Sequence, residues 1–205
     1  MQRIDALRVM YADINDDIVV TIMGAVAAEL YSLGHRKNFF YLQHAMGLAS
    51  SMGLGLALSK PNKRVIVLDG DGSLLMNLGT LSTVAWHAPK NLIHICWDNQ
   101  QYESSGGEPT VSTTGNIDFA GIAQSAGIQS ARAVSTVAEL KAAVSHALGG
   151  DGPHFIWARI EAGRAEAPPL RYDELENKYR FIRYIEETEG INILRVSMPA
   201  SYQLK

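Results

Sequence analysis

Two polar segments of this 205-residue sequence could hold one divalent cation between them. Asp71 lies in the tripeptide Gly70–Gly72, after the short, apolar and β-branched run Arg64–Leu68, which is typical of a buried strand. A second apolar run, Asn91–Trp97, leads to Asp98-Asn99, whose Asn is 28 residues beyond Asp71. Asp71 offers the hard oxygen that Mg²⁺ prefers. Since the carboxyl ends of parallel strands meet at one edge of a sheet, two strand ends are expected to share the cation.

The first of these junctions also has the composition of a phosphate site. Gly70 and Gly72 allow the backbone to approach a ligand closely, and a helix beginning near Ser73 would present unpaired N–H groups to an anion. A second junction of the same kind lies at Gly24-Ala25, after the apolar run Ile18–Met23. Its N–H groups could reach the same phosphate, although a simple tight turn is the alternative there.

The order of strand, Gly-Asp-Gly, helix, strand and Asn resembles the thiamine diphosphate motif. In that family the Asp, the Asn side chain and a backbone carbonyl two residues later hold Mg²⁺, which holds the diphosphate of the cofactor. The resemblance implies that thiamine diphosphate and Mg²⁺ are the cofactors, with Asp71, Asn99 and the carbonyl of Gln101 as the metal ligands. The residues that it places against the cofactor are Gly24, Ala25, Gly70, Asp71, Gly72, Ser73, Asn99, Gln101 and Tyr102.

A stretch before this motif makes the resemblance closer. His44–Gly47 precedes a run of small residues, Leu48–Leu58, and thiamine-dependent phosphonopyruvate and sulfopyruvate decarboxylases carry Gly-Ser-Met-Gly and a small-residue helix at the same distance. The match implies that Met46 keeps the cofactor bent and that the carbonyl of His44 accepts a bond from its aminopyrimidine ring. Both residues are therefore candidates for the catalytic machinery as well as for cofactor binding. A packed Met and a packed His are the alternatives.

The segment after Asn99 resembles the corresponding loop of phosphonopyruvate decarboxylases. It reads Gln100-Gln-Tyr-Glu-Ser-Ser-Gly-Gly-Glu-Pro-Thr110, and Glu108 stands where that family has Gln. A carboxylate facing the substrate would repel an anionic phosphonate or sulfonate, because like charges at close range are costly. Glu108 therefore leaves open which 2-oxo acid is the substrate.

Strand-like runs alternate with helical segments from 18 to 160, which predicts a doubly wound, mainly parallel sheet with helices on both faces. This three-layer α/β arrangement is the fold that the thiamine diphosphate resemblance implies. We expect a single domain over 1–205, with its core at about 18–160 and a linker, helix and tail at 161–205. Strands are expected at 18–23, 38–42, 64–68, 91–97 and 154–160, and helices at about 4–15, 25–33, 45–59, 118–127, 136–148 and 172–187.

Composition narrows the class of protein further. Hydrophobic residues make up 47% and charged residues 19% of the chain, a globular balance, and the net charge of −3 gives no footprint for nucleic acid. Polybasic runs that would favour a membrane surface are absent from the sequence, and Cys96 is its one cysteine. The first residues have no continuous apolar core of a signal peptide, so a cytoplasmic location is expected.

The family resemblance also has an implication for partners. Thiamine decarboxylases pair a diphosphate domain with a pyrimidine domain, whose glutamate bonds the N1′ atom of the cofactor, and the second domain is not recognisable in these 205 residues. We therefore expect a separate pyrimidine-domain (α) subunit and a hetero-oligomer. The chain is then expected to be the diphosphate-binding (β) subunit of a decarboxylase that converts a 3-substituted pyruvate to an aldehyde and CO₂. The alternatives are a subunit of an acetolactate synthase-like carboligase and a non-catalytic scaffold subunit.

Overall fold

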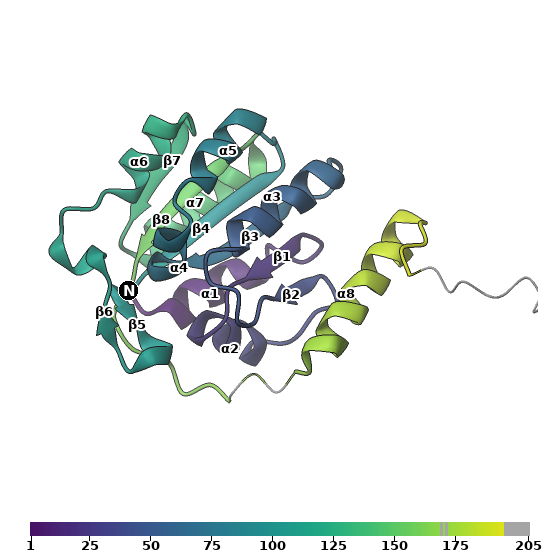
Figure 1. Ribbon diagram of the computed structural model, residues 1–205, viewed down its shortest axis with the longest axis horizontal. Coiled ribbons are helices and arrows are strands. Elements are labelled where there is room, and N and C mark those ends of the chain that lie inside the picture. Colours follow the sequence, from purple (N-terminus) through teal and green to yellow (C-terminus); the bar gives the residue numbers. More distant parts are fainter. Residues whose placement is uncertain (169, 171, 195–205) are drawn as a thin grey trace, which may run out of the picture.

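A sheet of parallel strands forms the centre of the protein (Figure 1), as seen in a computed structural model that describes residues 1–168, 170 and 172–194. Six strands lie in the order β2-β1-β3-β4-β8-β7, and every neighbouring pair is parallel. The strands are β1 (Ile18–Thr21), β2 (Phe39–Tyr41), β3 (Val65–Gly70), β4 (Leu92–Asp98), β7 (Ser130–Val134) and β8 (His154–Arg159). Most of their residues are buried, because helices cover both faces. The predicted doubly wound fold is confirmed.

The helices form the two outer layers (Figure 1). One layer contains α1 (Arg3–Tyr11), α2 (Ala25–Ser32) and α7 (Val137–Gly149), and the other contains α3 (Ala49–Ser59), α4 (Asp71–Met76), α5 (Thr80–His87) and α6 (Phe119–Ala126). A capping box is present at the start of α7, where the side chains of Thr136 and Glu139 bond each other's backbone N–H groups. None of the described helices is long and apolar enough to cross a membrane.

The direction of the chain reverses between β1 and β3. From β1 the chain passes through α2 to the outer strand β2, and it then returns through α3 to β3 on the other side of β1. The connections that leave β1 and β3 therefore diverge, which opens a crevice at the carboxyl ends of these two strands. The junctions at Gly24 and at Gly70–Gly72 lie on its two sides.

A helix of small residues packs very closely on the sheet, as its composition predicts. A Cβ atom placed on Gly53 of α3 would lie 2.1 Å from Cγ2 of Val67 in β3. Glycine is therefore required at this contact, which fixes β3 and the polar segment that follows it.

Several elements differ from the sequence-based prediction. The first helix ends at Tyr11, and the strand expected at 18–23 ends at Thr21. Strand β7 has no predicted counterpart, because it is an edge strand that is partly exposed and lacks a continuous apolar run. A small antiparallel hairpin, β5 (Gln101–Tyr102) with β6 (Glu108–Pro109), and two 3-10 turns, η1 (Glu103–Ser105) and η2 (Val111–Thr114), follow β4.

The C-terminal helix α8 (Glu174–Glu189) covers the free edge of the sheet at β2 (Figure 1). The buried side chain of Asn177 accepts a hydrogen bond from the backbone N–H of Tyr41 (3.3 Å) and donates one to its carbonyl oxygen (2.9 Å). The amide thus takes the place of a neighbouring strand at one residue of the edge.

Replacing Asn177 with Leu should release this edge. Two backbone groups of Tyr41 would lose their partners, at a cost of about 2 kcal/mol, so the Tyr41 amide should exchange with solvent about 30-fold faster. Native-state hydrogen exchange measures this directly. Lys178→Leu, at an exposed position on the same helix, is the control. Equal exchange rates in the two variants would show that apolar packing alone holds α8 in place.

Candidate cofactor site

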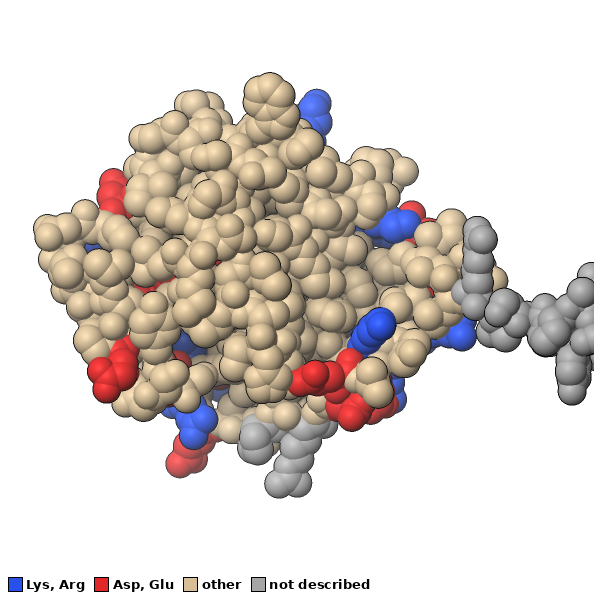
Figure 2. Space-filling model, in the orientation of Figure 1, with Lys and Arg blue, Asp and Glu red and all other residues tan. Residues whose placement is uncertain are grey.

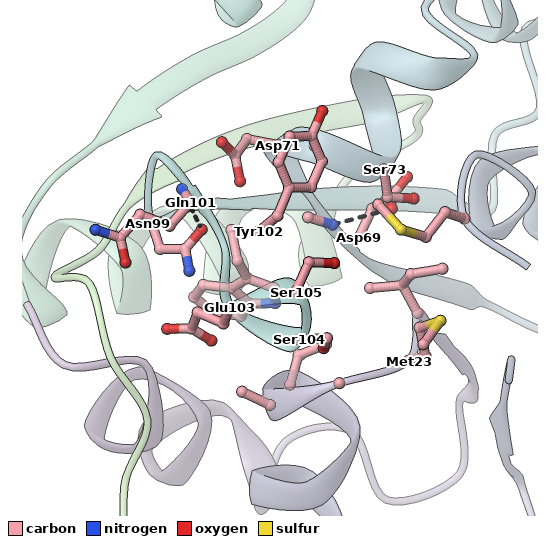
Figure 3. Close-up of a pocket in the computed structure, with 18 of the residues that line it drawn as sticks. Met23, Asp69, Asp71, Ser73, Asn99, Gln101, Tyr102, Glu103, Ser104 and Ser105 are labelled. Carbon is pink, nitrogen blue, oxygen red and sulfur yellow. Dashed lines mark hydrogen bonds between the residues drawn. The ribbon is translucent and has the colours of Figure 1, made fainter. Parts of the chain in front are cut away.

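A pocket occupies the crevice between β1 and β3 (Figure 3). Most of its lining comes from three segments: the β1–α2 junction, the β3–α4 junction and the end of β4 with the loop after it. The predicted residues among its lining are Gly24, Ala25, Met46, Gly70, Asp71, Gly72, Ser73, Asn99, Gln101 and Tyr102. The fold therefore brings together ten residues that are spread over 79 positions of the sequence, from 24 to 102.

Asp71 is the first residue of α4 and is 2% exposed. Burial raises the pKa of its carboxyl group to about 7, helped by the nearby Asp98 and opposed by a 2.5 Å hydrogen bond that the Thr110 hydroxyl donates. A carboxylate is thus held where water cannot compensate its charge. A divalent cation would stabilise the charged form, so the chemistry of this position fits Mg²⁺.

The other two predicted ligands lie at the start of the loop after β4. Asn99 directly follows the strand and is 8% exposed, and its Oδ1 accepts a hydrogen bond from the backbone N–H of Gln101 (3.2 Å). Gln100 between them adopts the left-handed conformation, with φ of +63°, and this turns the chain sharply. Figure 3 shows Asn99, Gln101 and Asp71 on one side of the pocket.

Two glycines form a cradle of backbone at the pocket, without side chains to block it. Gly24 has a φ of +88°, and a Cβ there would lie 3.0 Å from Oγ of Ser104. A Cβ on Gly72 would lie 2.3 Å from Cε1 of Tyr102, so the tyrosine ring packs directly on the glycine. Side chains at either position would fill the space next to the N-termini of α2 and α4, where an anion is favoured.

The segment before α3 is tied to this cradle. The backbone N–H of Gly47 donates to Oγ of Ser73 (3.0 Å), and the side chain of Asn77 donates to the Gly47 carbonyl oxygen (2.8 Å). Met46, one residue earlier, is half-buried and lines the pocket. Its location agrees with a contact to a bound cofactor, and its role in bending that cofactor stays a prediction.

The side chain of His44 lies outside the pocket that contains Asp71. It is 77% exposed, and its Nε2 lies 3.4 Å from a carboxylate oxygen of Glu174 on α8. His44 lines an adjoining cavity instead, and its φ of +53° is unusual for a residue with a side chain. The predicted contact through its backbone carbonyl stays a prediction.

Asp98, the residue before Asn99, has a structural environment. Its carboxylate accepts hydrogen bonds from the Ser112 hydroxyl (2.7 Å), the Trp157 indole N–H (2.8 Å) and the backbone N–H of Gln100 (3.1 Å). These bonds fix the loop that carries Asn99. Asp98 thus positions the candidate ligand Asn99 through contacts of its own and is not itself one of the predicted ligands.

A buried ionic cluster forms part of the pocket wall, and the sequence did not predict it. Arg3 of α1 lines the pocket, is 5% exposed, and bonds both carboxylate oxygens of Glu29 at 3.0 Å and one of Glu103 at 3.3 Å. Its contacts are 26 and 100 positions away in the sequence, so no local pattern could indicate them. By contrast, Glu108 is exposed on the hairpin and is not among the residues that line the pocket.

Comparisons with known proteins agree with this geometry. A family model described as the C-terminal TPP (thiamine pyrophosphate, or thiamine diphosphate) binding domain of thiamine pyrophosphate enzymes matches residues 20–158. The chain is 38% identical over 182 residues to phosphonopyruvate decarboxylase of Streptomyces viridochromogenes, which covers 87% of this chain and 45% of that protein. It is also 38% identical over 185 residues to sulfopyruvate decarboxylase subunit beta of Methanothermobacter thermautotrophicus, covering 90% of this chain and 96% of the relative.

The chain spans less than half the length of this phosphonopyruvate decarboxylase, and nearly the full length of the beta subunit. Among solved structures, benzoylformate decarboxylase from Polynucleobacter necessarius aligns with a TM-score of 0.66 and 20% identity, over 83% of this chain and 34% of that one. This likeness shows the fold alone. Together with the family match over residues 20–158, the relatives show that the chain belongs to the family of thiamine pyrophosphate-binding domains of thiamine pyrophosphate enzymes.

Proposed function

We propose that this chain is the diphosphate-binding subunit of a two-subunit, thiamine diphosphate-dependent decarboxylase. Its substrate would be a 3-substituted pyruvate of the phosphonopyruvate or sulfopyruvate type, and its products an aldehyde and CO₂. The observation that carries the proposal is the buried Asp71 carboxyl group, placed with Asn99 and Gln101 in a pocket bounded by two strand-to-helix junctions.

The residues of the pocket have separate proposed tasks. Asp71, the Asn99 side chain and the Gln101 carbonyl would hold Mg²⁺, while Gly24, Ala25, Gly70, Gly72 and Ser73 would surround the diphosphate. Tyr102 would close the pocket over Gly72, and Met46 with the His44 carbonyl would fix the shape and orientation of the rest of the cofactor. Once bound, thiamine diphosphate supplies the electron-accepting chemistry for decarboxylation.

The substrate class follows from the relatives. Proteins named phosphonopyruvate decarboxylase and sulfopyruvate decarboxylase subunit beta are 38% identical to the chain, and both names refer to pyruvates with an anionic substituent. Glu108 is compatible with such substrates, because it is exposed, although it pairs with Tyr102 on the hairpin, and it is not among the residues that line the pocket.

The partner is proposed from the same comparison. The match covers nearly all of a beta subunit but only 45% of the phosphonopyruvate decarboxylase. A second polypeptide would thus supply the pyrimidine domain and its activating glutamate, and the cofactor would be enclosed between the two subunits. This chain alone would hold the Mg-diphosphate end and show little decarboxylation.

Calorimetry and product analysis test the proposal. Thiamine diphosphate should bind only with Mg²⁺, and more tightly when the pyrimidine-domain subunit from the same genome is present. The complex should then release CO₂ from phosphonopyruvate or sulfopyruvate and form the aldehyde. Condensed hydroxy-oxo acids as products would identify a carboligase, and an absence of cofactor binding in every mixture would identify a scaffold subunit.

A further inference from the structure

One face of the protein is almost free of charge. The sequence has no Asp, Glu, Lys or Arg in 42–59, 72–89 or 119–131, and these ranges contain α3, α5 and α6. Figure 2, in the orientation of Figure 1, shows this face as nearly continuous tan, with charged side chains at its margins. Depletion of charge over such an area is the compositional mark of an interface core, because the free surface of a globular protein is normally rich in charged residues.

The same face exposes large apolar side chains at both ends. Leu48 and Met76 are 51% and 59% exposed at the end near the pocket, and Leu58 and Trp86 are 46% and 85% exposed at the other. The two pairs belong to one surface because α3 and α5 begin together. Oγ of Ser51 lies 3.4 Å from Oγ1 of Thr80, and both helices then run about two turns to Leu58 and Trp86.

This surface is continuous with the rim of the pocket. Met46 lines the pocket, and the next residue, Gly47, is hydrogen-bonded to Ser73 and Asn77. A Cβ on Gly47 would lie 3.2 Å from Cβ of Met76, so the segment that carries Leu48 is packed directly against α4. A partner protein bound over the pocket would therefore contact Leu48 and Met76 and, beyond them, the rest of the uncharged face.

We propose that the uncharged face of α3, α5 and α6 is the surface on which the pyrimidine-domain subunit docks, with Trp86 as its anchor farthest from the pocket. The inference rests on the proposed function, which requires a partner over the pocket. Because the face begins at the pocket rim, a partner that covers the pocket also reaches Leu48 and Met76, and this favours that partner over a second copy of the chain as the occupant. Trp is one of the residue types enriched among the side chains that dominate binding energy.

The face is large enough to supply about half of one side of an interface. Helix α3 has 11 residues, and α5 and α6 have 8 each. At about 1.5 Å per residue, with helices packed about 10 Å apart, the three helices cover roughly 400 Å² in projection, and one side of a stable interface covers about 800 Å². The pocket rim adds to this area. The opposite layer is a poorer candidate, since α1 and α7 carry charged residues such as Asp5, Arg8, Glu139 and Lys141.

A charge placed at the far end of the face tests the proposal without touching the pocket. Trp86→Glu should weaken the complex with the pyrimidine-domain subunit from the same genome at least tenfold, measured by calorimetry or analytical ultracentrifugation. Leu175→Glu, at a 63% exposed position on α8, is the matched control and should change the affinity less than twofold. Leu58→Glu replaces Trp86→Glu if circular dichroism shows that the latter is misfolded.

The remaining outcomes separate this inference from the proposed function. Unchanged affinity for the partner in both Trp86→Glu and Leu58→Glu would overturn the docking surface while the two-subunit enzyme stands. If the chain alone forms a dimer that Trp86→Glu dissociates, and partner affinity is unchanged, the face binds a second copy. Failure of the wild-type chain to bind Mg²⁺ and thiamine diphosphate would instead overturn the proposed function.

Discussion

Replacing Asp71 with Asn should abolish Mg²⁺-dependent binding of thiamine diphosphate and, at the same time, stabilise the cofactor-free protein. Binding should weaken at least about 100-fold, because a hard divalent cation loses its one charged ligand among the three proposed. Stability should rise because the carboxyl group is 2% exposed and its pKa is raised to about 7, so its charged form is disfavoured in the folded state. Effects of opposite sign distinguish a ligand from a residue that merely maintains the fold.

The stability of the cofactor-free protein should also depend on pH, because the pKa of Asp71 is raised in the folded state. A folded-state pKa of about 7, above the ordinary 3.8, means that the folded protein binds this proton more tightly than the unfolded chain does. The stabilising contribution is present at low pH and is lost as the pH rises from about 4 to about 7. Denaturation at pH 5 and pH 8 without Mg²⁺ should show a wild-type loss of about 2 kcal/mol that Asp71→Asn lacks.

Thr110→Val is the matched control for Asp71→Asn. It keeps the carboxyl group and removes the hydroxyl that donates to it at 2.5 Å. Its cofactor-free form should be less stable than wild type at pH 8, and it should still bind Mg²⁺ and thiamine diphosphate. If Asp71→Asn bound the cofactor like wild type, Asp71 would not be the proposed ligand. If its stability changed with pH as that of the wild type does, the pKa of the Asp71 carboxyl group would not be raised in the folded protein.

The parts of the fold and site that the sequence predicts are those encoded locally. The strand that ends at Gly70 and the strand that ends at Asp98 are continuous apolar runs, and each is followed by polar residues whose types already suggest their chemistry. Parallel pairing then places both strand ends at one edge, so Asp71 and Asn99 can be assigned to one pocket without coordinates. The small residues of α3 likewise indicate that this helix packs closely on the sheet, and only glycine fits at position 53 against Val67.

What the sequence does not predict depends on contacts between distant segments. Arg3 lines the pocket only because α1 packs beside α2, which places it next to Glu29 and Glu103. His44 illustrates the same limit: its position in the motif suggests the pocket, whereas the left-handed backbone directs its ring toward Glu174 on α8. Backbone conformation and long-range packing decide such cases, and neither is visible in residue types.

Two glycines of α3 should respond in opposite ways to the same substitution. Gly53→Ala would place a Cβ 2.1 Å from Cγ2 of Val67, whereas Gly55→Ala meets nothing within 4 Å. Val67 is a fully buried, β-branched residue in the middle of β3, so its methyl group cannot swing aside. The helix must then lift from the sheet, which should destabilise the protein by about 3 kcal/mol.

Gly55→Ala should instead stabilise the protein by about 0.5–1 kcal/mol, since alanine removes the entropic cost of a glycine within a helix. Chemical denaturation of both variants in the chain alone measures the difference. Gly53→Ala should also displace the cofactor site, because β3 ends at Gly70, directly before Asp71. Thiamine diphosphate should therefore bind more weakly to this variant, even under conditions in which the variant is fully folded. Equal stabilities of the two variants would show that β3 tolerates a larger separation from α3 than the packing implies. Equal binding of thiamine diphosphate by the two variants would show that the position of Asp71 does not depend on this contact.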